Sequence, residues 1–199
     1  MPQTLVLASA SSSRRMLMEN AGLSFQAEAA QIDERAVEQD IAHKALCPGE
    51  LALELALRKA LDVSTRNVGS LVVGCDQTMS LGERVYHKPV DREEARANLA
   101  TLRGRTHRLN SAVVLVSDGK EIWRDLSVAD LRMRDFSDAF LEDYLDRCGD
   151  AVMRSVGCYQ LEGIGIQLFD DIVGDYFTIL GLPLLPLLSE LRSLGVLNV

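Results

Sequence analysis

The sequence predicts an α/β protein in which short buried strands alternate with amphipathic helices. The apolar runs at 4–8 and 111–117 are typical of strands that are buried on both faces. The leucine-rich segment 50–63 carries apolar side chains at helical spacing, which predicts a helix that packs on a sheet. The 199 residues include no repeat, low-complexity tract or linker, so we expect one compact unit.

A serine-rich loop, residues 9–13, follows the first predicted strand and precedes a helix predicted over 14–21. Free backbone N–H groups and hydroxyls at a helix N-terminus form an anion site, and the helix dipole reinforces it. Arg14 and Arg15 lie in the first turn, where cations destabilise a helix unless an anion lies beside them. Serine N-capping with two solvated arginines explains the same residues, and the loop by itself does not decide between the two interpretations.

The segment around Asp76 is the strongest candidate for the chemistry. The apolar run 71–73 predicts a buried strand that ends at Gly74, which places Asp76 at the sheet rim, where open α/β sheets bind ligands. A turn over 81–85 then returns the chain and brings Lys88 beside Asp76. A carboxylate and an ammonium in one place suit a metal-bound phosphate. The alternative is that Asp76 caps a turn and Lys88 is a solvated surface lysine.

Other charged residues have both a functional and a structural interpretation. Asp33 and Glu34 follow a weak strand candidate at 24–30 and are either metal ligands or part of a polar turn. Lys59 lies toward the C-terminal end of the predicted helix 50–63, where a lysine is normal.

The rest of the chain continues the alternation of strands and helices. The expected elements are a helix over 91–102, a hairpin turn at Asp118-Gly119, strands over 121–123 and 127–135, a helix over 137–147, a strand over 166–169 and a closing helix over 184–194. The glycine-rich stretch 157–165 is not a dinucleotide-binding loop, because no helix follows at the required place.

Composition limits the classes of function. The net charge of −8 and the lack of a basic stripe argue against binding to a nucleic-acid polymer, but a few clustered cations still allow a small anionic ligand. The four cysteines have no zinc-ligand or C-x-x-C spacing, and His43, His87 and His107 show no metal spacing and are expected at the surface. We expect no signal peptide, no transmembrane span, no membrane partner and a cytoplasmic location.

Six motifs, in this order and spacing, resemble the Maf family of nucleoside triphosphate pyrophosphatases over essentially the whole chain. The motifs are Leu7-Ala8-Ser9-Ala10-Ser11, Ile32-Asp33-Glu34, Gly74-Cys75-Asp76-Gln77, Lys88-Pro89, Leu102-Arg103-Gly104-Arg105-Thr106-His107 and Gly181-Leu182-Pro183-Leu184. The resemblance implies a single domain over 1–199 with a central twisted mixed sheet flanked by helices. It also implies two lobes with an active-site cleft between them, and a homodimer.

The resemblance implies an activity as well: hydrolysis of a nucleoside triphosphate to the monophosphate and pyrophosphate with a divalent metal, Mg²⁺ or Mn²⁺, as house-cleaning of non-canonical nucleotides. By motif match, Asp76 is the general base, and Glu34 and Asp76 are the metal ligands. The remaining residues that the motifs assign to catalysis and to substrate binding are Lys59, Lys88, Ser9, Ser11, Arg14 and Arg15.

Three positions depart from the commonest family pattern, and they are the positions that the family associates with substrate choice. They are Ser13, which replaces the first arginine of the usual S-P-R-R, and Gln77 and Glu162. Gln77 and Glu162 resemble the branch that acts on 7-methyl-GTP rather than the branch that prefers dTTP and UTP, whereas Ser13 matches neither. The alternative functions are a dTTP- or UTP-preferring pyrophosphatase and a nucleotide-binding regulator of septum formation with little turnover.

Overall fold

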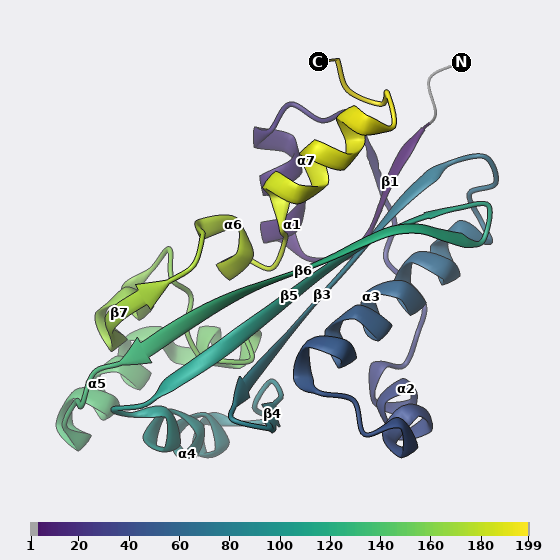
Figure 1. Ribbon diagram of the computed structural model, residues 1–199. Helices are drawn as coiled ribbons and strands as arrows, with labels where there is room; N and C mark the ends of the chain where they lie inside the picture. Colours follow the sequence, from purple (N-terminus) through teal and green to yellow (C-terminus); the bar gives the residue numbers. More distant parts are fainter. Residues whose placement is uncertain (1–3, 199) are drawn as a thin grey trace. The chain divides into compact units, whose positions relative to one another are not determined.

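A computed structural model describes residues 4–198, so the ends of the predicted domain, 1–3 and 199, lie outside the described residues. Within residues 4–198 the fold is α/β, as predicted, with a mixed seven-stranded sheet of order β2-β1-β3-β5-β6-β7 and β4 paired to β3 (Figure 1). The strands are β1 (Leu5–Ala8), β2 (Gln26–Ala27), β3 (Leu71–Leu81), β4 (Arg84–Tyr86), β5 (Thr106–Ser117), β6 (Lys120–Met133) and β7 (Phe169–Val173). The helices are α1 (Ser12–Asn20), α2 (Glu34–Ile41), α3 (Pro48–Ser64), α4 (Arg92–Leu102), α5 (Asp138–Cys148), α6 (Tyr176–Ile179) and α7 (Leu184–Ser193), with short 3₁₀ helices η1 (Ala42–Lys44), η2 (Gly149–Arg154) and η3 (Ile164–Leu168). Among the described residues, no helix has both the length and the apolar composition that crossing a membrane requires.

The chain divides into two compact units. The first unit contains the described residues up to Gln77, together with Asn110–Val128 and the residues from Asp175 onward. The second unit contains Thr78–Leu109 and Ala129–Gly174. Strands β3, β5 and β6 therefore each contribute residues to both units. The cleft that the resemblance implies between two lobes stays a prediction.

In the first unit, β1 is a central parallel strand that pairs with β2 on one side and with β3 on the other. Because successive side chains of a strand point to opposite faces, β1 contributes to two cores. Leu5 and Leu7 pack with α1 and α7, and Val6 and Ala8 pack with α3. Figure 1 agrees, with α1 beside α7 and α3 apart from both. The predicted leucine-rich helix is thus confirmed as the cover of one face of the sheet.

Gly74 does not end its strand, and the prediction that Asp76 follows the strand is wrong. Strand β3 continues without interruption to Leu81, so Asp76 lies inside it. A Cβ atom on Gly74 would lie 2.2 Å from the carbonyl oxygen of Ala56 and 2.7 Å from the Cβ of Ala60. The glycine therefore marks the place where α3 approaches the strand closely, which is a known use of glycine within strands.

The predicted hairpin turn at Asp118-Gly119 is confirmed. Both residues have positive φ, 47° and 73°, as a two-residue turn between antiparallel strands requires. The strand before the turn begins at Thr106 rather than at residue 111. The two strands predicted after the turn are one strand, β6, whose side chains alternate between more exposed and less exposed positions along most of its length.

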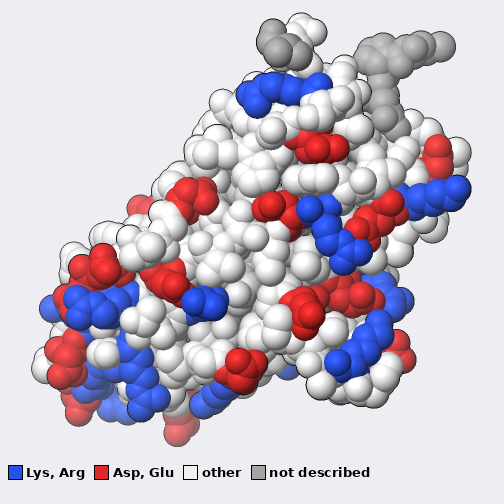
Figure 2. All heavy atoms as spheres, in the orientation of Figure 1, with Lys and Arg blue, Asp and Glu red and all other residues white. Residues whose placement is uncertain are grey.

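In the second unit, short-range signals set the helix ends. Asp91 caps α4 by accepting a hydrogen bond from the backbone N–H of Glu94 at 2.8 Å, and Ser137 caps α5 in the same way through Phe140. Arginines of α4 and its C-terminal end pair with acids of α5, and Figure 2 shows the two charge signs intermixed over these helices. These cations are neutralised by the protein itself.

Two further predictions in the second unit are wrong. Residues 164–168 form the 3₁₀ helix η3 rather than the start of a strand, and β7 begins at Phe169. His107 is 1% exposed, not a surface residue, because β5 already includes it and the rings of Tyr159 and Phe169 pack around it. Its Nε2 lies 2.8 Å from the hydroxyl of Tyr159, and its Nδ1 has no hydrogen-bond partner within residues 4–198.

The burial of His107 predicts a loss of stability in weak acid. Burial lowers the pKa of its imidazole from 6.5 to about 4, so the folded protein binds this proton less readily than the unfolded chain does. Its contribution is fully present above pH 6.5 and is lost as the pH falls toward 4, by about 3 kcal/mol in total. Urea unfolding of the wild type and of His107→Gln between pH 7.5 and 4.5 measures the difference. If the free energy of unfolding had the same pH dependence in the two proteins, the loss of stability in acid would not come from His107.

Candidate active site

Three of the predicted site residues meet in the first unit. The ammonium of Lys59, on α3, donates to Asp76 Oδ1 on β3 at 2.5 Å and lies 2.8 Å from Glu34 Oε1 at the start of α2. The side chains of Lys59 and Asp76 are 11% and 8% exposed, whereas that of Glu34 is 51% exposed. We call Glu34, Lys59 and Asp76 the acid cluster. It combines two negative charges with one positive charge and leaves one carboxylate open to solvent.

Sequence reasoning assigned Lys59 to the site by resemblance but missed its pairing with both acids. The signal was the position of Lys59 on its helix. Ala52, Ala56, Ala60 and Val63 form the buried face of α3, and Lys59 lies on the same side. A charged residue within a buried stripe has to be neutralised by a partner, because the unpaired charge is strongly disfavoured in an apolar environment.

The serine loop caps α1, as one of the two interpretations proposed. Ser11 accepts from the backbone N–H of Arg14 at 3.4 Å, and the backbone N–H of Ser11 donates to Ser9 Oγ at 3.2 Å. Arg15 is exposed and pairs with Glu19 along the helix at 3.3 Å. Ser13 is half-buried in the first turn. The two arginines therefore differ, since Arg15 is a solvated surface cation and Arg14 is not.

The guanidinium of Arg14 connects three parts of the first unit. Its Nε donates to the carbonyl of Gly181 at 2.8 Å, and its Nη1 donates to the carbonyl of Cys75 at 2.9 Å and to Ser9 Oγ at 3.4 Å. Its Nη2 has no hydrogen-bond partner among the described residues. Arg14 therefore positions the backbone beside Asp76 and keeps two N–H donors for an anionic ligand.

The thiol of Cys75 lies near the charges of Arg14 and Lys59. Burial raises its pKa to about 11, and the neighbouring charges of Arg14 and Lys59 oppose this only weakly. A thiol that stays protonated at neutral pH is a poor nucleophile. The centre therefore has carboxylates, rather than a thiolate, available for chemistry.

Gln77 faces away from the acid cluster. Its side-chain nitrogen donates to Ser111 Oγ at 2.8 Å and to the carbonyls of Thr178 and Ile179 at 3.0 and 3.2 Å. Neighbouring residues of a strand point to opposite faces, so Asp76 reaches α3 while Gln77 reaches α6. The protein uses the amide nitrogen of Gln77, which leaves its oxygen as the atom able to contact a ligand.

Lys88 and Glu162 belong to the second unit. Lys88 is exposed and follows β4, and Glu162 is exposed in the turn that leads into η3. A hydrogen bond from the backbone N–H of Gly163 to the carbonyl of Gln160, at 3.1 Å, closes this turn. A single site that contains Lys88 and Glu162 together with Asp76 stays a prediction.

The acid cluster suits a divalent cation that is shared with a substrate. The described residues contain no group of three or more His, Cys, Asp or Glu side chains able to hold a metal ion. Mg²⁺ is commonly bound through one or two carboxylates plus substrate phosphates rather than by a protein cage. Glu34 and Asp76, which both contact one ammonium nitrogen, supply two such carboxylates close together.

Comparison with known proteins shows the family of this chain. A sequence model of the Maf family, described as Maf-like protein, matches residues 4–194. The chain belongs to the Maf family. It is 57% identical over 198 residues to a 7-methyl-GTP pyrophosphatase of Rhizobium johnstonii, with 100% of both chains covered. It is 55% identical to a 7-methyl-GTP pyrophosphatase of Brucella abortus over 94% of each chain, and 54% identical to a nucleoside triphosphate pyrophosphatase of Rhodopseudomonas palustris over 96% of this chain and 94% of the other.

Removing the lysine of the acid cluster should destabilise the protein. In Lys59→Met, Asp76 stays buried without its counter-charge, so we expect the free energy of unfolding to fall by about 3–5 kcal/mol. Urea unfolding followed by circular dichroism measures the change. Arg58→Met is the control on the same helix, because it removes an exposed pair with Glu54 and should cost less than about 1 kcal/mol. Equal effects of the two substitutions would mean that Lys59 does not neutralise a buried charge.

Proposed function

We propose that this protein hydrolyses nucleoside triphosphates to the monophosphate and pyrophosphate, as one Maf-like domain over 1–199. The observation that carries the proposal is the acid cluster, in which Lys59 holds Asp76 and Glu34, in a chain whose full-length relatives are named pyrophosphatases. The house-cleaning of modified nucleotides, a homodimer and a cytoplasmic location are parts of the same proposal. The free state of all four cysteines supports the location.

In this proposal Glu34 and Asp76 bind the metal ion, and Asp76 also takes part in proton transfer. A bound Mg²⁺ or Mn²⁺, held by Glu34 and Asp76, would acidify water and offset phosphate charge. Asp76 orients the attacking water and accepts its proton, and Lys59 fixes the position of the Asp76 carboxylate.

Phosphate binding falls to the positive groups and the loop donors. Arg14 binds a phosphate oxygen through Nη2, and Lys88 offsets the charge that gathers on the departing pyrophosphate, while Lys59 acts through the two carboxylates that it pairs with. Ser9, Ser11 and the N–H groups at the start of α1 add neutral donors, and Arg15 adds a more distant positive charge.

For the base, we propose a 7-methylated guanine nucleotide. Relatives that match this chain over their full length are named 7-methyl-GTP pyrophosphatases, which supports this choice over dTTP or UTP. The Glu162 carboxylate is an acceptor for the N1–H and amino groups of guanine and a counter-charge for its methylated ring. Gln77 acts mainly by holding α6, and Ser13 removes a positive charge from the serine loop relative to the usual motif.

The proposed general base gives the first test. We expect Asp76→Asn to lower pyrophosphate release by about 10²–10⁴-fold, because the amide cannot take a proton, while nucleotide binding persists. A pyrophosphate-release assay over a panel of nucleotides, with and without Mg²⁺ or Mn²⁺, measures turnover, and calorimetry measures binding. Unchanged turnover in the variant would remove Asp76 from the mechanism. Tight binding without turnover in the wild type would instead favour the nucleotide-binding regulator.

Substrate choice gives the second test. We expect Glu162→Gln to lower the kcat/KM ratio of 7-methyl-GTP over GTP by at least about tenfold, because the neutral amide loses a charge-assisted contact with the cationic base. Competition assays with both nucleotides measure this ratio directly. The neighbouring variant Gln160→Glu serves as the control for a change of charge in the same loop. An unaltered ratio would show that the base is read elsewhere.

A further inference from the structure

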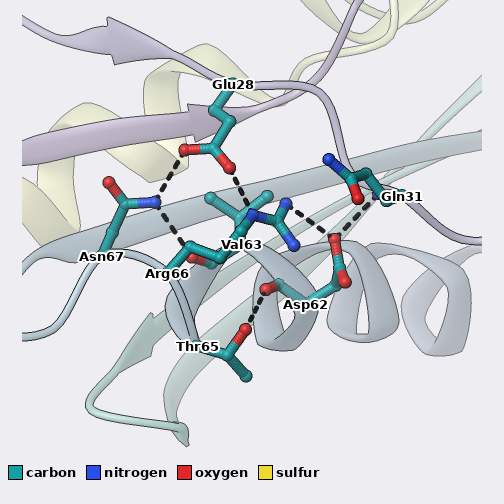
Figure 3. A network of polar contacts seen from close by, with 7 residues as sticks. All are labelled: Glu28, Gln31, Asp62, Val63, Thr65, Arg66 and Asn67. Atoms are coloured by element: carbon teal, nitrogen blue, oxygen red, sulfur yellow. Dashed lines mark hydrogen bonds and ion pairs between the residues drawn. The ribbon is translucent and has the colours of Figure 1, made fainter.

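The segment between β2 and α2 lies against the C-terminal half of α3 through a network of charged contacts. Figure 3 shows Arg66 between the carboxylates of Glu28 and Asp62, with Asn67 beside Glu28. Arg66 Nε donates to Glu28 at 2.5 Å and its Nη2 donates to Asp62 at 2.9 Å. Asp62 also accepts from the backbone N–H of Gln31 at 2.8 Å. The network therefore joins a segment without regular structure to a well-packed helix.

The same segment contacts α3 once more, at the acid cluster. Glu34 meets Lys59, Gln31 meets Asp62 and Glu28 meets Arg66, so the segment runs antiparallel to the helix. We call these three contacts the α3 ladder. Lys59 and Asp62 lie three residues apart on one face of α3, and Arg66 lies in the turn two residues beyond the end of the helix at Ser64. The contact between Glu34 and Lys59 therefore follows two other contacts between the same segment and the α3 region.

Glu34 needs such support because its own helix provides little. In α2 only Ile41, at the far end, is buried. The N-cap residue Asp33 accepts from Ala36 at 3.1 Å, which orders the first turn but does not attach it to the rest of the protein. The position of Glu34 therefore depends on the backbone that precedes it.

Asp62 is the member of the ladder best placed to fix that backbone. It binds a main-chain N–H, three residues before Glu34, rather than a mobile side chain. Arg66 in turn holds Asp62 and lowers the pKa of its carboxyl, so the acceptor is ionised at neutral pH. Hydrogen bonds to an ionised acceptor are about twice as strong as neutral ones. At the other end, the N–H of Glu28 donates to the carbonyl of Leu7 at 3.0 Å, which anchors the segment to β1.

We propose that Asp62 and Arg66 are positioning residues for the reaction: through the α3 ladder they hold Glu34 opposite Lys59 and Asp76, in the geometry that a shared divalent cation requires. The inference rests on the proposed function and adds two residues to it. Partners that orient a metal-binding side chain typically change metal affinity or activity by 10–100-fold when they are removed.

The test compares Asp62→Leu with a matched control, Glu54→Leu. Both acids lie on α3, are about equally exposed at 23% and 19%, and pair with an arginine four residues later at 2.9 Å. Only Asp62 binds the segment that leads to Glu34. For Asp62→Leu we expect about a tenfold loss of kcat/KM for nucleotide and a higher Mg²⁺ concentration at half-maximal rate. Hydrogen exchange should accelerate in the peptides that cover 28–36, and Glu54→Leu should change none of these quantities.

Two conservative variants separate positioning from folding. Asp62→Asn keeps an acceptor for Gln31 and should recover most of the activity, and Arg66→Met keeps the Asp62–Gln31 hydrogen bond and should have a smaller effect than Asp62→Leu. Normal kinetics and metal requirement in Asp62→Leu would overturn the inference, even if exchange accelerates. An equal loss in Glu54→Leu would also overturn it, because the effect would then reflect helix stability. Absence of pyrophosphate release from the wild type would overturn the proposed function, and exchange would still decide whether Asp62 orders the segment.

Discussion

The rest of the first unit is built around the ammonium of Lys59, which is nearly buried and is neutralised by two carboxylates. A buried charge without a partner is too costly for a marginally stable fold, so helix α3 has to place this nitrogen within reach of Asp76. The sequence around both residues meets this requirement. Gly74 and Asp76 point to the same face of β3, and the missing side chain of Gly74 lets the helix backbone at Ala56 come close to the strand.

Two consecutive residues of β3 contact different elements on opposite faces of the sheet. Asp76 points toward Lys59 of α3, and Gln77 points toward the carbonyls of Thr178 and Ile179 in α6. The main chain just before Asp76 is held by Arg14, which donates to the carbonyl of Cys75 and to that of Gly181. One arginine therefore links the serine loop, the strand that carries the proposed base and the turn before α7. Rigid support of this kind limits the motion of catalytic groups before a substrate arrives.

Local signals predicted those parts of the fold that depend on a few neighbouring residues. The starts of α4 and α5 and the turn at Asp118-Gly119 follow from hydrogen bonds and backbone angles within four residues, whereas the cap at Ser11 was one of two interpretations that the sequence left open. Such features follow directly from side-chain chemistry, because their partners are near in sequence.

Features set by distant partners were not predictable in the same way. The continuation of β3 past Gly74 depends on the approach of α3, and the burial of His107 depends on Tyr159, which lies far along the chain. The pairing of Lys59 with two acids depends on three separate elements. For the candidate site, motif resemblance gave the identities of the residues, but only the structure showed that Lys59 is their electrostatic centre.

The local charges of the acid cluster also explain how a protein of net charge −8 can be suited to a polyanionic substrate. Two carboxylates against one ammonium leave the cluster negative, so by itself it repels a triphosphate. The same excess of negative charge attracts a divalent cation, and a cation held there presents its remaining coordination positions to phosphate oxygens. Arg14, whose Nη2 has no protein partner among the described residues, supplies a second positive group that needs no metal. Attraction for the substrate is thus confined to a few groups, while the predominantly acidic remainder of the molecule disfavours nonspecific binding of other phosphates.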